Sequence, residues 1–169
     1  SYGRWYAREA SVFEEPGSPR HEFLVELVRA RDVAPEGVVL RKDLSTCLDL
    51  SHRGLGDALG EVLARVLPKL PELGELLLAG NRWTDATIAP LFASLQAFGP
   101  RLKTLDLSDN DLDFQSAYQL AQLVGRPACG LRTLKVSNAD FDDSELAPVM
   151  EALRANETLT SLALSGNHA

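Results

Sequence analysis

One short skeleton, Leu-x-x-Leu-x-Leu-x-x-Asn-x-Leu, recurs along most of this chain and limits its possible folds more than any other feature. The clearest copy runs from Leu102 to Leu112. Five copies begin at residues 45, 73, 102, 131 and 159, so neighbouring copies lie 28 or 29 residues apart. A fixed period of this length is typical of a solenoid, in which each repeat forms one turn of a coil.

Within each copy the apolar spacing changes from alternation to a helical period. Alternation in the skeleton predicts a strand, and apolar positions 16, 19, 20 and 23 of each copy fall on one helical face. We therefore expect four helices between the strands. The four positions hold Gly60, Leu63, Ala64 and Leu67; Ile88, Leu91, Phe92 and Leu95; Ala117, Leu120, Ala121 and Val124; and Leu146, Val149, Met150 and Leu153.

Over residues 45–169 this pattern resembles the leucine-rich repeats of the ribonuclease-inhibitor type. The resemblance implies an α/β fold, namely a right-handed solenoid or horseshoe segment with a parallel concave sheet and convex helices. It also implies a protein-binding role, without indicating any particular protein.

Residues 1–44 lack the skeleton, and we interpret them as an N-terminal capping segment. Ser18 and Pro19 fit the start of a helix over about 19–31, and a short strand is expected over about 38–40. The chain stops just after the fifth skeleton, so we expect the repeats to continue in a longer protein.

Composition narrows the classes of partner. The net charge is −7, of which −6 falls on residues 45–169, and nucleic acids or anionic membranes require basic surfaces. No apolar run is long enough to span a membrane. Cys47 and Cys129 fall too far apart in the coil for a disulfide, which favours a reducing, cytoplasmic location. No catalytic motif is present, and the three histidines are scattered, so no enzyme, cofactor or metal site is predicted.

Two polar columns have structural interpretations. Asn81, Asn110 and Asn167 are expected to bond the backbone of neighbouring turns. Ala139 interrupts this column, and Asn138 is a candidate substitute. At position 13, aspartates are expected to cap the helices, as in Asp57, Asp85 and Asp143, with Asp113 one position earlier.

Two further motifs have weak functional alternatives. The acidic edge formed by Asp109, Asp111, Asp113, Asp140 and Asp142 has the oxygen spacing of a cation loop but lacks the glycine and glutamate of an EF-hand. The segment from Gly54 to Gly60 has glycines between a strand and a helix, yet its spacing departs from that of a dinucleotide loop, and other copies make the turn without glycine. A solvated acidic edge and an ordinary turn are the simpler interpretations.

Strand side chains that point away from the core should form the concave surface. Asp106 and Lys135 are expected to be neighbours there, either pairing with each other or meeting a partner. Trp83 is predicted to be a core residue. The candidate partner-binding residues are Asp49, His52, Glu75, Leu77, Lys103, Asp106, Asp109, Arg132, Lys135 and Asn138.

The sequence thus favours an interaction module of an intracellular scaffold or regulatory protein, monomeric by itself, that binds a protein on its concave face. One alternative is a regulatory domain for a small GTPase or an attached enzyme. Another is a structural spacer in a cytoskeletal or ciliary assembly.

Overall fold

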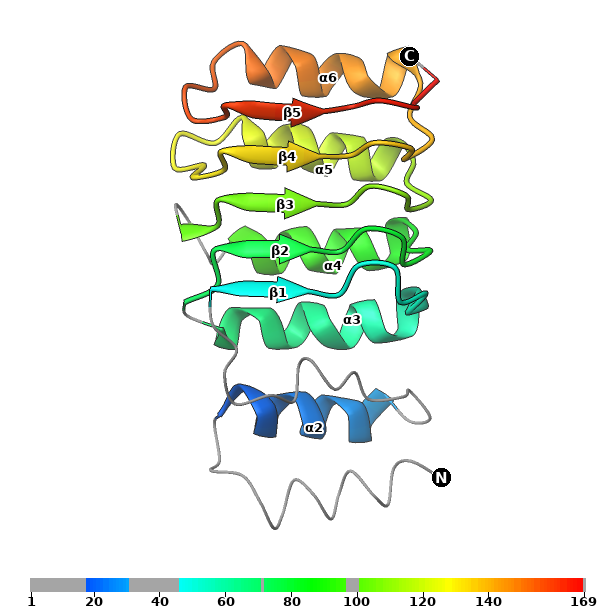
Figure 1. Ribbon diagram of the computed structural model, residues 1–169, viewed down its shortest axis with the longest axis vertical. Coiled ribbons are helices and arrows are strands. Elements are labelled where there is room, and N and C mark those ends of the chain that lie inside the picture. The colour runs from blue at the N-terminus through cyan, green and yellow to red at the C-terminus, as the bar shows by residue number, and fades with distance from the viewer. Residues whose placement is uncertain (1–17, 31–45, 71, 97–100, 169) are drawn as a thin grey trace.

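The protein is an α/β solenoid, as the repeat predicted, in a computed structural model that describes residues 18–30, 46–70, 72–96 and 101–168. Its five strands form one parallel sheet in chain order, with a helix between successive strands (Figure 1). The strands are β1 Cys47–Asp49, β2 Glu75–Leu77, β3 Thr104–Asp106, β4 Thr133–Lys135 and β5 Ser161–Ala163. The helices are α2 Pro19–Ala30, α3 Gly56–Val66, η1 Leu67–Lys69, α4 Asp85–Leu95, α5 Phe114–Val124 and α6 Asp143–Leu153.

Helix α2 packs against α3 at the N-terminal end of the coil. The Ser18 hydroxyl accepts a hydrogen bond from the His21 N–H at 3.1 Å, which is the expected cap. Phe23, Leu24 and Leu27 are buried. The expected strand over 38–40 lies outside the described residues, as does most of the segment 1–44.

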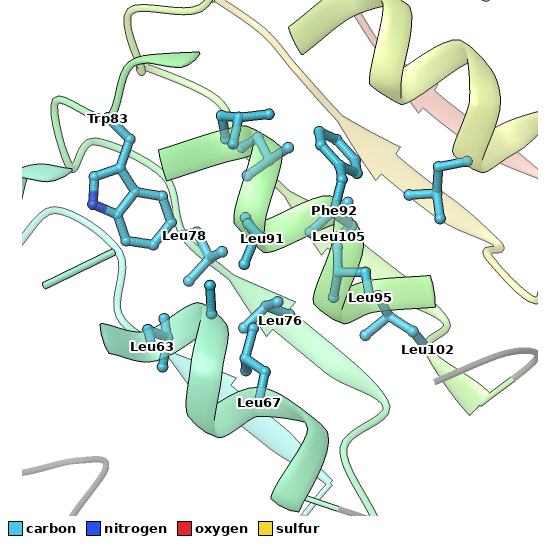
Figure 2. Close-up of a cluster of buried hydrophobic side chains, with 14 of the residues drawn as sticks. Leu63, Leu67, Leu76, Leu78, Trp83, Leu91, Phe92, Leu95, Leu102 and Leu105 are labelled. Carbon is cyan, nitrogen blue, oxygen red and sulfur yellow. The ribbon is translucent and has the colours of Figure 1, made fainter. Parts of the chain in front are cut away.

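The strands pair in the same alignment as the repeats have in the sequence. Each skeleton residue pairs with its counterpart in the next copy, so the core-facing leucines form a row from Leu48 to Leu162. Helix residues at positions 16, 19, 20 and 23 close the core from the other side, and Figure 2 shows this packing around Leu76, Leu91 and Phe92. Trp83 is fully buried, as predicted.

Met150 departs from the prediction, because its side chain is 48% exposed. Its position faces the following repeat, and α6 is the last helix of the described residues. Leu162, on β5, is exposed for the same reason, whereas its counterparts from Leu48 to Leu134 are buried.

The asparagine column forms the predicted ladder. The Asn110 amide Nδ2 donates to the carbonyl oxygens of Leu78 and Leu107 at 3.1 and 2.9 Å, and its Oδ1 accepts from the N–H groups of Asn81 and Trp83 at 3.1 Å each. Asn81 and Asn167 bond their neighbouring turns in the same way. These amides satisfy backbone groups that are buried between repeats.

Asn138 does not substitute for the missing asparagine. Its side chain is exposed, and its Nδ2 donates to Asp109 Oδ1 at 2.8 Å. Ala139, which occupies the ladder position, is fully buried. The backbone at Asn138 is left-handed, with φ 50°, and we attribute the outward side chain to that conformation.

The predicted aspartate caps are off by one residue in two helices. Thr84 and Asp142 are the caps of α4 and α6, whereas Asp113 caps α5 as expected. Helix α3 begins after Leu55 without a side-chain cap. A helix cap needs extended backbone, and in α4, α5 and α6 position 12 supplies it while position 13 is already helical.

Two of the position-13 aspartates, Asp57 and Asp85, act on the next repeat instead. Asp57 accepts hydrogen bonds from the Thr84 N–H and hydroxyl at 3.0 and 2.9 Å and from the Thr87 hydroxyl at 2.6 Å. Asp85 likewise accepts from the Asp113 and Ser116 N–H groups at 3.2 Å each. Each carboxylate therefore fastens the first turn of the following helix to its own.

Burial raises the pKa of Asp57, but the hydrogen bonds from Thr84 and Thr87 outweigh it and leave that pKa below its usual value. A carboxylate that accepts several hydrogen bonds is favoured in its charged form. The contact between α3 and α4 is therefore made by an ionised aspartate at neutral pH.

The junction between α5 and α6 is built differently. Position 13 of the third copy holds Phe114, which has no hydrogen-bond acceptor in its side chain, and α6 caps itself. The Asp142 carboxylate accepts from the Glu145 N–H at 2.9 Å, and Glu145 Oε2 accepts from the Asp142 N–H at 3.0 Å. This is a capping box within one helix.

Candidate functional site

The sheet surface opposite the helices brings together side chains from all five strands. Register places Asp49, Leu77, Asp106, Lys135 and Ala163 in one row across β1 to β5. A second row runs from Cys47 through Glu75 to Ser161. Position 7 is small throughout, with serine or alanine, so the floor beside these rows carries no bulky side chain.

Asp106 and Lys135 are neighbours, as the sequence predicted. Lys135 Nζ lies 3.4 Å from Asp106 Oδ2, and the two side chains are 45% and 13% exposed. Because the Lys135 side chain is open to solvent, this single pair contributes about 0.2–1 kcal/mol to stability. The pair therefore adds little to the stability of the fold. It lies at the middle of the surface.

Two carboxylates on this surface accept hydrogen bonds from nearby backbone groups. Asp49 Oδ1 accepts from the Ser51 N–H at 2.9 Å, and Asp106 Oδ1 accepts from the Ser108 N–H at 3.1 Å. The bond from Ser51 is the main cause that lowers the pKa of Asp49. Both carboxylates therefore hold the chain where it leaves the strand.

The margin at the amino ends of the strands carries Glu75, Lys103 and Arg132. Glu75 and Lys103 line one shallow hollow together with Arg101. The Arg132 N–H donates to the Lys103 carbonyl at 2.8 Å, so these two candidate residues lie on adjacent turns. Burial and the nearby Glu75 and Asp49 carboxylates raise the pKa of the exposed Cys47 thiol, which makes it a poor nucleophile.

At the carboxyl ends of the strands, position 8 forms a left-handed column. His52, Asp109 and Asn138 have φ values of 57°, 55° and 50°, and Gly80 and Gly166 continue the column at 66° and 75°. A Cβ at Gly80 would lie 2.3 Å from His52 Nδ1, and one at Gly166 would lie 1.8 Å from Asn138 Oδ1. The side chain of one turn thus covers a glycine of the next.

The ten predicted residues consequently fall into three groups, and whether any of them binds a partner stays a prediction. Asp49, Glu75, Leu77, Asp106 and Lys135 lie on the strands; Lys103 and Arg132 lie just before β3 and β4; and His52, Asp109 and Asn138 lie in the carboxyl-end column.

The acidic edge shows no cation site in the part of the chain that the structure describes, where no three acidic, histidine or cysteine side chains form a suitable group. Asp113 and Asp142 are helix caps, and Asp140 pairs with His168 at 2.7 Å. These contacts account for three of the five carboxylates.

Packing explains the glycine-rich turn. A Cβ at Gly60 would lie 2.4 Å from the Thr87 side chain, so glycine permits α3 to approach α4. Gly54 and Gly56 have φ values of 61° and 67°, and the Gly56 carbonyl accepts from Trp83 Nε1 at 3.0 Å. Each of these glycines has a role in the turn or in packing.

None of the helices within the described ranges has the length and apolar character required to cross a membrane.

Sequence analysis missed Phe114 and Tyr118, which are exposed on α5. The signal was a phenylalanine at the position where three other copies have aspartate. It also missed Arg82, whose guanidinium lies over Gly54.

No protein-family model matches this sequence. The structure is similar to one titled Leiomodin-1 Actin-Binding Site 2, with 18% sequence identity and a TM-score of 0.59, covering 87% of this chain and 79% of that one. It is also similar to the C-terminal domain of tropomodulin from Caenorhabditis elegans, with 15% identity and a TM-score of 0.62, covering 85% and 82%. At these identities the likeness establishes the fold, which is of the leucine-rich-repeat type.

Proposed function

We propose that this chain is a protein-interaction module that binds its partner on the concave face of the sheet, with actin as the first partner to test. The observation that carries the proposal is the row from Asp49 to Ala163, which five strands hold in register on a surface that the helices leave uncovered. Actin is the choice because leiomodin-1, which shares the fold, is described by an actin-binding site.

The chemistry of the face supports recognition of a polar protein surface. The Asp106 and Lys135 side chains present opposite charges at its centre, and the small residues at position 7 leave room for a partner's side chains. Paired charges of this kind fix the register of a complex more than they add affinity. The repeats, of the ribonuclease-inhibitor-like type in our proposal, supply the rigid support.

Binding rather than catalysis is the proposed role. His52 and His168 lie in the first and fifth copies, and the exposed thiol of Cys47 has a raised pKa. In this proposal the chain is a monomeric module that acts inside the cell in association with the cytoskeleton and binds a protein. Its acidic repeats argue against nucleic acid as the partner.

The test is sedimentation of the purified protein with actin filaments, together with titration of monomeric actin. Asp106→Ala with Lys135→Ala removes the central pair without changing the net charge and should weaken binding about tenfold, on the order of 1.4 kcal/mol. Glu151→Ala with Arg154→Ala is the matched control, because these residues form an exposed pair at 3.2 Å at the carboxyl end of α6.

Failure of both actin forms to bind would remove actin as the partner. Equal weakening by the two double substitutions would contradict the concave face as the binding surface. Hydrogen exchange in the complex gives a second measurement, since protection should centre on β2 to β4 and spare the exposed side of α5.

A further inference from the structure

Four large apolar side chains are exposed among the described residues, namely Phe114, Tyr118, Met150 and Leu162. Met150 and Leu162 lie on the last described helix and strand, where no further turn covers them. Phe114 and Tyr118 lie on α5 in the middle of the coil, and their exposed fractions are 59% and 48%. Their place on the last described helix and strand therefore accounts for the first pair of exposed residues and leaves the second pair unexplained.

Phe114 occupies the position at which Asp57 and Asp85 fasten the following helix. The α5 to α6 junction lacks that bond, and α6 compensates with its own capping box. A phenylalanine with 59% exposure contributes little burial in exchange. The fold therefore gives no reason for an aromatic residue at this position.

Tyr118 follows Phe114 by four residues, so the two rings are neighbours on one face of α5. The corresponding residues in the other repeats are Glu61, Ala89 and Ala147, none of them aromatic. The exposed aromatic pair is thus particular to the third copy.

The charge around this pair is negative. Neither residues 104–125 nor residues 136–153 contain a lysine or an arginine, although Arg126 directly follows this part of the chain and Arg82 lines one hollow together with Asp111. Asp111, Asp113, Asp142 and Asp143 are exposed at the amino ends of α5 and α6. Aromatic faces beside carboxylates attract guanidinium groups, through cation–π contact and charge together.

We propose that the Phe114 and Tyr118 face of α5, with the carboxylates at the amino ends of α5 and α6, is a second docking surface that binds an arginine-bearing segment of a protein partner. The two aromatic rings stack on the planar guanidinium group, and the carboxylates accept hydrogen bonds from its N–H groups. The surface belongs to the helical layer, on the side of the sheet opposite the concave face (Figure 1). It stands independently of the concave-face proposal.

The test uses a labelled peptide in which arginine alternates with leucine, titrated into the intact chain at fixed ionic strength and followed by fluorescence anisotropy. Phe114→Ala with Tyr118→Ala should weaken binding about tenfold, because the carboxylates remain but both rings are lost. Met150→Ala is the matched control, since Met150 is as exposed as Tyr118 and lies on the last described helix.

A second variant guards against loss of structure. Phe114→Asp with Glu145→Thr keeps the net charge and recreates the pairing of Asp85 with Ser116, so it should fold normally and bind the peptide about threefold more weakly, because one ring is lost while Tyr118 and the carboxylates remain. Asp106→Ala with Lys135→Ala should leave peptide binding unchanged. Equal affinity of all variants, or equal binding of a peptide with glutamine in place of arginine, would overturn the proposal.

Discussion

The second and third copies meet in a different way from the third and fourth. At the first of these junctions Asn110 bonds the backbone of both turns, and Asp85 fastens the start of α5 to α4. At the second, Ala139 replaces the asparagine and Phe114 replaces the aspartate. Both bonds between copies are therefore lost at the same place.

The difference shows that one packing problem has two solutions in the same protein. A carboxylate from the preceding repeat joins two helices, whereas a capping box satisfies one helix by itself. At α6 the capping box satisfies the first turn without a carboxylate at position 13 of the third copy. That position holds the exposed Phe114 instead.

The largest effect is expected from the asparagine ladder. Asn110→Ala should lower the free energy of unfolding by about 3 kcal/mol, because buried backbone groups of Leu78, Leu107 and Trp83 lose their partners. Urea denaturation measures it. Asn138→Gly, which removes an exposed amide and suits the left-handed backbone there, should cost no more than about 0.5 kcal/mol. A loss below about 1 kcal/mol for Asn110→Ala would show that the ladder does not distinguish the two junctions.

The carboxylate contacts between helices should have the next largest effect. Asp57→Ala should cost about 1–2 kcal/mol, because the Thr84 N–H and two hydroxyl groups lose their acceptor. Asp143→Ala, at the same repeat position in the fourth copy but exposed, should cost no more than about 0.5 kcal/mol. Thermal unfolding of the two variants gives the comparison, and equal losses would contradict the role assigned to Asp57.

Introducing the carboxylate contact at the α5 to α6 junction should have a smaller effect on the free energy of unfolding. Phe114→Asp alone should destabilise the chain by about 0.5–1 kcal/mol, because it places a carboxylate near Glu145 and Asp142. Adding Glu145→Thr should recover that loss by offering a hydroxyl donor, as Thr87 does for Asp57. Unfolding of the two single variants and the double variant measures the coupling, and strictly additive effects would show that position 13 cannot fasten α6.

The smallest effect concerns pH. The pKa of Asp57 is lowered in the folded state, so its contribution to stability is present above the unfolded pKa of about 3.9 and is lost as pH falls through the lower folded value. Asp57→Asn should therefore flatten the decline in stability between about pH 5 and pH 3. Asp85 is a poorer probe, since its lowered pKa is accompanied by a raised pKa at Asp113. An unchanged pH profile in Asp57→Asn would contradict this assignment.

Much of the fold could be predicted because the repeat states the same pattern five times. Strand register, the helix faces and the Asn81 ladder follow from spacing alone. The prediction for Asp85 was one residue away from the cap and assigned it to its own helix, because a sequence offset does not show that a side chain reaches the next turn. The prediction that Met150 is buried was wrong, because the helical period describes a repeat that is covered by a neighbour on each side.

The sequence predicted which residues lie on the candidate surface, but not which of their side chains are occupied by local hydrogen bonds. The Asp106 and Lys135 pair followed from strand alternation and register. The hydrogen bonds that occupy Asp49 depend on how the chain turns after each strand, which spacing does not reveal. Phe114 was overlooked because an apolar residue inside a repeat protein is normally assigned to the core, and only the structure shows its exposure.

The left-handed column at the ends of the strands has a consequence for the evolution of this chain. The His52 side chain occupies the space that a Cβ at position 80 would take, and Gly80 leaves that space open. Asn138 and Gly166 form a second such pair. Copies that look interchangeable by their leucines therefore differ at position 8, and duplication of the first copy next to itself would place two histidine side chains side by side, so one of them would have to move. Recombination among these repeats should be limited by this difference.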